Sequence, residues 1–301
     1  MRTIGVSAPV QVKNILFLTD FSKPSEAALP FATAFGRGYG AKVHALHVLM
    51  PVAFAYTTPG LVATALEAAE EAAQAEMQRI ESQLAGLPHE TIVERGIGVW
   101  PCVEQAIRDD DIDLIVVGTH GRTGAEKLLL GSVAEEIFRR SPVPVLTIGP
   151  SVRSSVHNGA RFHRVLFATD FTPESLAGAP YAISLAQEDQ ARLLLLFVMR
   201  KPLQKDAAVD KQFELSVAEA IHRLYEIVSK DAKLGLPPEV IVEFGEPAER
   251  IVAAAQQRRV DLIVLGVRDA ASRMGAATHL ERAIAHKVVA HASCPVLTVR
   301  G

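Results

Sequence analysis

Ile15-Leu16-Phe17-Leu18-Thr19-Asp20-Phe21-Ser22 is followed later in the chain by a close copy of itself, Val165-Leu166-Phe167-Ala168-Thr169-Asp170-Phe171-Thr172. Three other segments recur in the same order and at nearly the same separation. They are Ile92–Glu94 with Gly96, Asp113–Gly118 and Pro144–Ile148, which return as Ile241–Glu243 with Gly245, Asp261–Gly266 and Pro295–Val299. Four matches in one order indicate a duplicated domain.

The chain of 301 residues therefore divides into two halves. We expect one domain at residues 11–149 and the other at residues 163–301. The stretch between them, residues 150–162, is rich in Ser with few apolar residues, which is typical of a linker. Hydrophobic residues make up 49% of the chain, so each half can bury a sizeable core.

Each half alternates predicted strands with predicted helices. Apolar runs such as Leu114–Val117 and Ile263–Leu265 have the length and the β-branched content of strands buried on both faces. Helical spacing of apolar residues marks the helices expected at Pro24–Arg37, Leu61–Leu84, Pro101–Asp109, Ser132–Arg140, Pro173–Glu188, Asp206–Lys233, Pro247–Arg258 and Ala276–His291. This order predicts an α/β fold, a doubly wound and Rossmann-like parallel sheet in each half, with ligands at the carboxyl ends of the strands.

The charge composition gives no support for nucleic acid or an anionic membrane as a partner. The formal net charge is −3, which gives no basic face for nucleic acid and no attraction to an anionic membrane surface. No apolar run reaches the length of a membrane span. The two cysteines fall at non-equivalent places in the repeat, so a disulfide is not favoured and a reducing, cytoplasmic location is expected.

A glycine-rich segment follows the predicted strand that ends at Gly118. It continues through His120, Gly121 and Arg122, and the spacing G-x2-G-x9-G-S closes on Gly131 and Ser132. Glycines let the backbone approach a phosphate, and a helix that starts near Ser132 and Val133 presents free N–H groups to an anion. We expect Ser132 to cap this helix and to donate to a phosphate oxygen, with Arg122 adding charge. His120 either meets the ligand or is a solvated loop residue.

With these motifs the sequence resembles the universal stress protein family, in a tandem arrangement. Gly118, Gly121, Gly131 and Ser132 match that family's ATP-binding pattern. The resemblance implies that Asp20 contacts the nucleoside and that backbone groups near His47-Val48 meet the adenine. It also implies a five-stranded parallel sheet in the order 3-2-1-4-5. An alternative for Asp20 is a purely local turn residue, because Asp170 repeats it.

The resemblance further implies ligands and partners. ATP is the expected ligand, with AMP or ADP as alternatives and Mg²⁺ as a companion of the phosphates. Family members commonly dimerise through the fifth strand, so residues 143–148 are expected to pair with residues 294–299 within the chain. A further homodimer and unknown protein partners stay open.

The second copy departs from the phosphate-binding pattern. Gly266 is retained, but Asp269 stands at the second glycine position, and the Gly-Ser pair falls on His279-Leu280 or on Arg282-Ala283. A carboxylate repels phosphate, and Leu or Ala side chains cannot donate a hydrogen bond to it. We therefore expect one nucleotide per chain, bound in the first half.

No residue is nominated for catalysis, because the sequence has neither a Walker loop nor a nucleophile elbow. No metal site is expected from His279, His286 and His291. Zinc sites usually need three or four ligands, often with Cys or carboxylate among them, and a mixed polar helix face is the default for these histidines. Cys102 at a helix start is a weak candidate for redox sensing. The favoured function is a stress-response regulator that binds ATP. The alternatives are an adaptor that binds no nucleotide and, after it, a slow ATPase.

Overall fold

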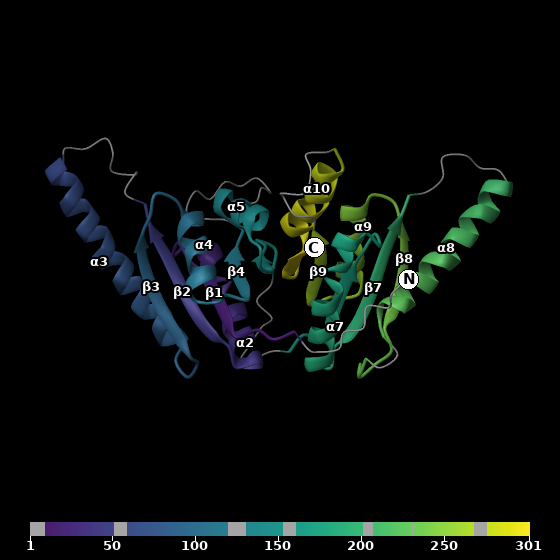
Figure 1. Cartoon of the computed structure of the whole chain (residues 1–301), viewed down its shortest axis with the longest axis horizontal. Helices are drawn as coiled ribbons and strands as arrows, with labels where there is room; N and C mark the ends of the chain where they lie inside the picture. The colour runs from purple at the N-terminus through teal and green to yellow at the C-terminus, as the bar shows by residue number, and fades with distance from the viewer. Residues whose placement is uncertain are drawn as a thin grey trace. The chain divides into compact units, whose positions relative to one another are not determined.

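The computed structural model describes residues 10–50, 59–119, 131–152, 161–200, 207–229, 232–267 and 276–301. The chain separates into two compact units, whose main bodies are Gln11–Pro150 and Arg161–Gly301. Each unit contains a five-stranded parallel sheet with its own helices (Figure 1).

The first unit follows the predicted alternation of strands and helices. Its strands are β1 (Asn14–Leu18), β2 (Lys42–Leu49), β3 (His89–Arg95), β4 (Leu114–Gly118) and β5 (Val145–Ile148), and its helices are α1 (Lys23–Glu26), α2 (Leu29–Tyr39), α3 (Pro59–Gln83), α4 (Val99–Asp109) and α5 (Ser132–Arg140). The sheet order is β3-β2-β1-β4-β5, with every neighbouring pair parallel. The implied order 3-2-1-4-5 is confirmed.

The second unit repeats this plan. Its strands are β6 (Arg164–Ala168), β7 (Arg192–Met199), β8 (Glu239–Phe244), β9 (Leu262–Val267) and β10 (Val296–Arg300), and its helices are α6 (Pro173–Leu176), α7 (Ala179–Glu188), α8 (Ala207–Ile227), α9 (Pro247–Gln257) and α10 (Ala276–His291). Its order, β8-β7-β6-β9-β10, is again 3-2-1-4-5 when the strands are counted within the unit.

The central strands form the core of each sheet. Phe17 in β1 and Phe167 in β6 are fully buried, and the residues on either side of each are buried too. Strands covered by helices on both faces read as continuous apolar runs, which is why the repeated segments were visible in the sequence.

A repeated aspartate fastens the central strand to its neighbour. Asp113 Oδ2 accepts hydrogen bonds from Lys13 N (2.7 Å) and Asn14 N (3.0 Å). Asp261 Oδ2 accepts the equivalent bonds from His163 N (2.8 Å) and Arg164 N (2.9 Å). These aspartates recur because each one satisfies the backbone N–H groups at the start of a central strand.

One helix predicted in each half is two helices. The expected helix at Pro24–Arg37 is divided into α1 and α2, and the one at Pro173–Glu188 into α6 and α7. The division falls just before Pro30 and Pro180, which lie at the starts of α2 and α7. Proline cannot donate the hydrogen bond that would continue the preceding helix, so the prediction of one continuous helix was wrong.

Candidate functional site

A cavity of about 410 Å³ lies at the carboxyl ends of β1, β2 and β4 in the first unit. The crossovers leave β1 and β4 toward opposite sides of the sheet, so this is the topological switch point, where ligands of such folds bind. Seven elements (β1, α1, β2, α3, α4, β4 and α5) and the turns beside them supply the lining residues. These residues are Leu18, Thr19, Asp20, Ser25, Leu46, His47, Val48, Leu49, Met50, Leu66, Ala69, Val99, Val117, Gly118, Thr119, Gly131, Ser132, Val133 and Ala134.

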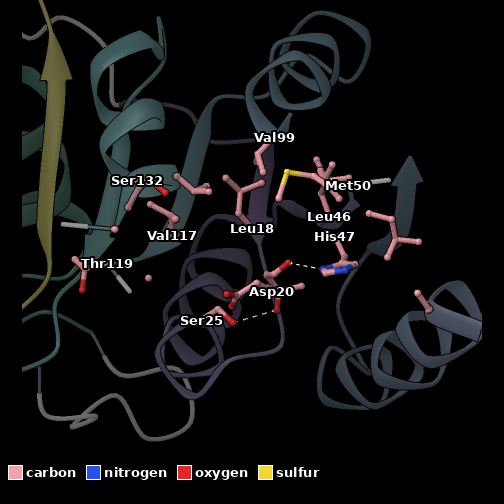
Figure 2. A pocket seen from close by; sticks show the side chains of 18 of the residues that line it. Leu18, Asp20, Ser25, Leu46, His47, Met50, Val99, Val117, Thr119 and Ser132 are labelled. Carbon is pink, nitrogen blue, oxygen red and sulfur yellow. Dashed lines mark hydrogen bonds between the residues drawn. The ribbon is translucent and has the colours of Figure 1, made fainter. Parts of the chain in front are cut away.

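Six of the predicted site residues line this cavity: Asp20, Val48, Gly118, Gly131, Ser132 and Val133. In Figure 2, Ser132 and His47 lie on opposite sides of the set of cavity-lining residues, with Leu18 and Asp20 between them. The predicted residues His120, Gly121 and Arg122 lie outside the described residues. An anion at Ser132 and a planar group near His47 could therefore occupy two ends of one cavity.

Asp20 is held in a tight turn after β1. Its Oδ1 accepts hydrogen bonds from Ser22 N (3.0 Å) and Ser22 Oγ (2.5 Å), and Ser22 caps α1 by accepting from Ser25 N. Between them Phe21 adopts a φ of 62°, a conformation that is uncommon outside glycine. The carboxylate thus has a local structural function as well as a place on the cavity wall.

Gly118 is required by close packing. A Cβ atom there would lie 2.8 Å from the Pro24 carbonyl carbon, and at Gly266 it would lie 2.6 Å from the Ser175 carbonyl carbon. Real Cβ atoms do not approach backbone so closely, so β4 and β9 both need glycine where the first short helix crosses them. The retention of Gly266 in the second unit follows from this packing alone.

Gly131 and Ser132 form the entrance to α5. The Gly131 N–H donates to Thr119 O (2.5 Å), and Gly131 itself is the N-cap, with φ −60° and ψ 150°. The expectation that Ser132 caps the helix was wrong, because Ser132 is already its first helical residue. Its exposed side chain and the free N–H groups of this first turn line the cavity, which is the arrangement that stabilises an anion.

The other end of the cavity is the end of β2. Thr19 N donates to Leu46 O (3.0 Å), which extends the ladder between β1 and β2 by one bond. Alternate residues of a parallel strand face the same neighbour, so the next residue of β2 on that side is Val48. Because β1 has ended there, the N–H and C=O of Val48 face the space beyond its end, where the edge of a planar heterocycle could pair with them.

Sequence reasoning missed several wall residues. Thr19 and Ser25 are buried and hydrogen-bonded to each other through their hydroxyls (3.2 Å), and α3 supplies Leu66 and Ala69. The recurrence of Thr19 as Thr169 and of Ser25 as Ser175 was the available signal for the first pair. The contribution of α3 had no comparable signal, since its long polar pattern indicates only a solvated surface.

The second unit keeps the turn but changes its surroundings. Asp170 Oδ1 accepts from Thr172 N (2.9 Å) and Thr172 Oγ1 (2.6 Å), and Phe171 has a φ of 65°. Desolvation favours the protonated acid, but hydrogen bonds from Thr172 and Ser175 outweigh it and lower the pKa of Asp170. The Arg223 guanidinium of α8 lies over the Phe171 ring, with its carbon 4.1 Å from the ring centroid. A positive charge therefore packs against that turn.

The helix that should follow a phosphate loop also differs. The residues aligned with Gly131-Ser132, His279-Leu280 or Arg282-Ala283, lie inside α10, which already begins at Ala276. Backbone N–H groups inside a helix are bonded within it, so neither pair can present them to an anion as the start of α5 does. Asp269 lies outside the described residues.

Neither cysteine is poised for reaction. Burial, with help from Glu94, raises the pKa of the Cys102 thiol, and burial raises the pKa of Cys294 to about 12. Both are free thiols. Within the described residues, no three His, Cys, Asp or Glu side chains are placed to hold a metal ion together. In that same part of the chain, every helix is too short or too polar to cross a bilayer.

Comparison with known proteins gives a consistent result. A family model described as the universal stress protein family matches residues 11–149 and again residues 161–300. Universal stress protein MJ0577 of Methanocaldococcus jannaschii is 29% identical over 166 residues, covering 46% of this chain and 96% of that protein. YxiE of Bacillus subtilis is 30% identical over 150 residues, covering 46% of this chain and 99% of that protein. Each relative therefore corresponds to one half of the chain.

A solved structure matches both halves at once. The universal stress protein of Archaeoglobus fulgidus aligns with a TM-score of 0.66 and 24% identity, and the alignment covers 97% of each chain. At this identity the likeness concerns the fold, and it agrees with the two five-stranded parallel sheets described above.

Proposed function

The chain belongs to the universal stress protein family, and on that premise we propose that its first unit binds ATP, one molecule per chain, and that occupancy regulates the interaction of the protein with partners. AMP and ADP are alternative ligands, and Mg²⁺ would accompany the phosphates. The second unit, in this proposal, binds nucleotide weakly or not at all.

The observation that carries the proposal is Gly131. Its φ of −60° is one that any residue adopts, so its conformation does not require glycine. It lies on the cavity wall immediately before the exposed Ser132 and the start of α5. A residue without a side chain at this place leaves room for phosphate oxygens to reach the N–H groups of the helix.

The nucleoside end of the proposed site is formed by Asp20 and Val48. The cavity between them and α5 has mainly aliphatic walls, from Leu18, Val117 and Val99 among others, and these suit the faces of an adenine ring. His120, Gly121 and Arg122 complete the phosphate end in this proposal.

The rest of the proposal concerns assembly and place. We expect residues 11–149 and 163–301 to fold as separate domains joined by residues 150–162. Residues 143–148 would pair with residues 294–299, and two chains could associate further. Free, buried thiols suit a reducing cytoplasm.

The test is calorimetric titration of ATP into the wild type and into the double variant Gly131→Ala/Ser132→Ala. Ser82→Ala, an exposed position on α3 away from the cavity, is the matched control. We expect the double variant to lose about tenfold or more in affinity, the effect of one hydrogen bond to a charged group, and the control to bind normally. Equal affinity in all three proteins would reject the site. No binding by any of them would favour a nucleotide-free adaptor.

A further inference from the structure

We propose that His47 is a positioning residue for the nucleoside end of the cavity. Its side chain fixes the turn that carries Asp20 against the strand end that carries Val48. The inference rests on the proposed nucleotide binding and adds to it a residue whose removal should leave the fold intact.

The hydrogen bond of His47 is well defined. The side chain is buried, with 6% of its surface exposed, and Nδ1 lies 2.8 Å from the Thr19 carbonyl oxygen. A carbonyl oxygen only accepts, so Nδ1 carries the proton and donates. This bond therefore fixes the imidazole in one tautomer and ties the end of β2 to the residue after β1.

Thr19 is in turn hydrogen-bonded to the turn that contains Asp20. Its N–H donates to Leu46 O (3.0 Å), and its Oγ1 accepts from Phe21 N (3.0 Å). Asp20 lies between Thr19 and Phe21, and its own Oδ1 accepts hydrogen bonds from Ser22. Holding the Thr19 carbonyl thus limits the rotation of the Asp20 backbone.

Ring packing supports the same geometry. The centroids of the Phe21 and His47 rings are 4.2 Å apart with an interplanar angle of 32°. Phe21 has a φ of 62°, and such a conformation persists only where its surroundings determine it. The histidine therefore supports the turn both by its hydrogen bond and by its ring.

The second unit shows that the fold does not depend on the histidine. Its corresponding residue is Phe197, because Thr169 N donates to Leu196 O (3.0 Å) as Thr19 N does to Leu46 O. The rings of Phe171 and Phe197 pack at 4.8 Å, and Phe171 keeps its φ of 65°. Phenylalanine keeps the ring contact but has no N–H group to donate. The hydrogen bond is consequently a feature that the described second unit lacks at this position.

The experiment compares His47→Phe, which copies the second unit, with His47→Asn, whose amide can donate in place of Nδ1. ATP and adenosine are titrated into each by calorimetry and by the fluorescence of Trp100. This is the single tryptophan of the chain, and it is adjacent to the cavity residue Val99. Thermal unfolding without ligand is recorded in parallel, and Phe197→His is the control.

We expect His47→Phe to lower the affinity for ATP and for adenosine by the same factor, about tenfold for a lost buried hydrogen bond. His47→Asn should bind both ligands within about threefold of the wild type, since it retains a donor. Phe197→His should change neither affinity nor stoichiometry. All variants should fold.

Four results would overturn the inference. They are unchanged affinity in His47→Phe, a loss in His47→Asn as large as in His47→Phe, a loss for ATP without one for adenosine, and failure of His47→Phe to fold. A wild type that binds neither ligand would instead reject the proposed function, on which this inference rests.

Discussion

The turns after β1 and β6 have the same hydrogen bonds and backbone conformation, whereas the starts of α5 and α10 differ. Asp20 and Asp170 accept the same pair of hydrogen bonds, and the phenylalanine after each has the same unusual φ. By contrast, α5 begins at Ser132 beside a cavity, while α10 already contains the residues aligned with that entrance. Residues shared by both units therefore have a function in the fold. Residues found in the first unit alone are the candidates for a function specific to that unit.

This comparison changes the reading of two sequence motifs. Gly118 belongs to the expected ATP pattern, yet Gly266 has the same packing requirement in a unit without the rest of that pattern. Asp20 and Asp170 likewise share a turn. Gly118 and Asp20 thus have structural reasons to be present. Because Val48 recurs as Val198, the residues that distinguish the proposed nucleotide site are Gly131, Ser132 and His47.

The largest expected effect comes from Gly118→Ala and Gly266→Ala. Each adds a methyl group against backbone that cannot move aside, so we expect a loss of about 3 kcal/mol in the stability of the affected unit, the upper range for overpacking. Urea denaturation followed by far-ultraviolet circular dichroism measures it. Loss of stability in the Gly118 variant only would contradict the shared structural function.

A smaller and sharper comparison uses Asp20→Ala and Asp170→Ala. Each removes the acceptor of two hydrogen bonds next to a helix cap, so both should destabilise their units by about 1 kcal/mol. Only Asp20→Ala should weaken ATP binding in calorimetry. If Asp170→Ala weakened ATP binding equally, the assignment of the site to the first unit would fail.

The pH dependence of the Asp170 turn has a definite sign. Its pKa is lowered in the folded state, so its contribution to stability is present above the ordinary value of 3.8 and is lost as the pH falls through the lower, folded value. We expect Asp170→Ala to reduce the difference in stability between pH 5 and pH 2.5, measured by urea denaturation at each pH. If the difference in stability between the two pH values were unchanged in Asp170→Ala, Asp170 would not be a source of the pH dependence.

His44 provides a second comparison between the two units. It is buried in β2, Nδ1 lies 3.7 Å from Glu90 Oε2 and 3.9 Å from Asp110 Oδ2, and both ring nitrogens lack hydrogen-bond partners in the described chain. The second unit has Leu194 there, since His44 pairs with Leu16 and Leu194 with Leu166. Burial, with help from Lys42, lowers the pKa of His44.

Because the unfolded chain takes up this proton at a higher pH than the folded chain, the first unit should lose stability as the pH falls below 6.5 toward the folded pKa. His44→Leu should remove that loss. Thermal unfolding at pH 7.5 and pH 5 measures it, and the variant should gain on the wild type at the lower pH. An equal acid response in both proteins would contradict the prediction.

The smallest effect concerns the thiols. Their raised pKa values and burial predict that neither Cys102 nor Cys294 reacts with a thiol reagent at pH 8 before unfolding. Rapid labelling of either cysteine in the native protein would restore a redox role to consideration.

The sequence predicted the fold well because duplication repeats the apolar strands and their turns. The α/β class, the doubly wound sheet in each half and the helix at Ser132–Arg140 are confirmed. The break before Pro30 was visible in principle, since proline cannot continue a helix. The hydrogen bond of His47 was not predictable, because it joins β2 to the turn after β1 across a separation that no sequence spacing encodes.

In our proposal the two units share a fold but differ in nucleotide binding. The most direct test is the number of ATP molecules bound per chain at saturation, determined by calorimetry on the full-length protein. We expect one ATP molecule per chain, with a change in Trp100 fluorescence that saturates at the same ratio. Two molecules per chain, or one that persists in Gly131→Ala/Ser132→Ala, would contradict it.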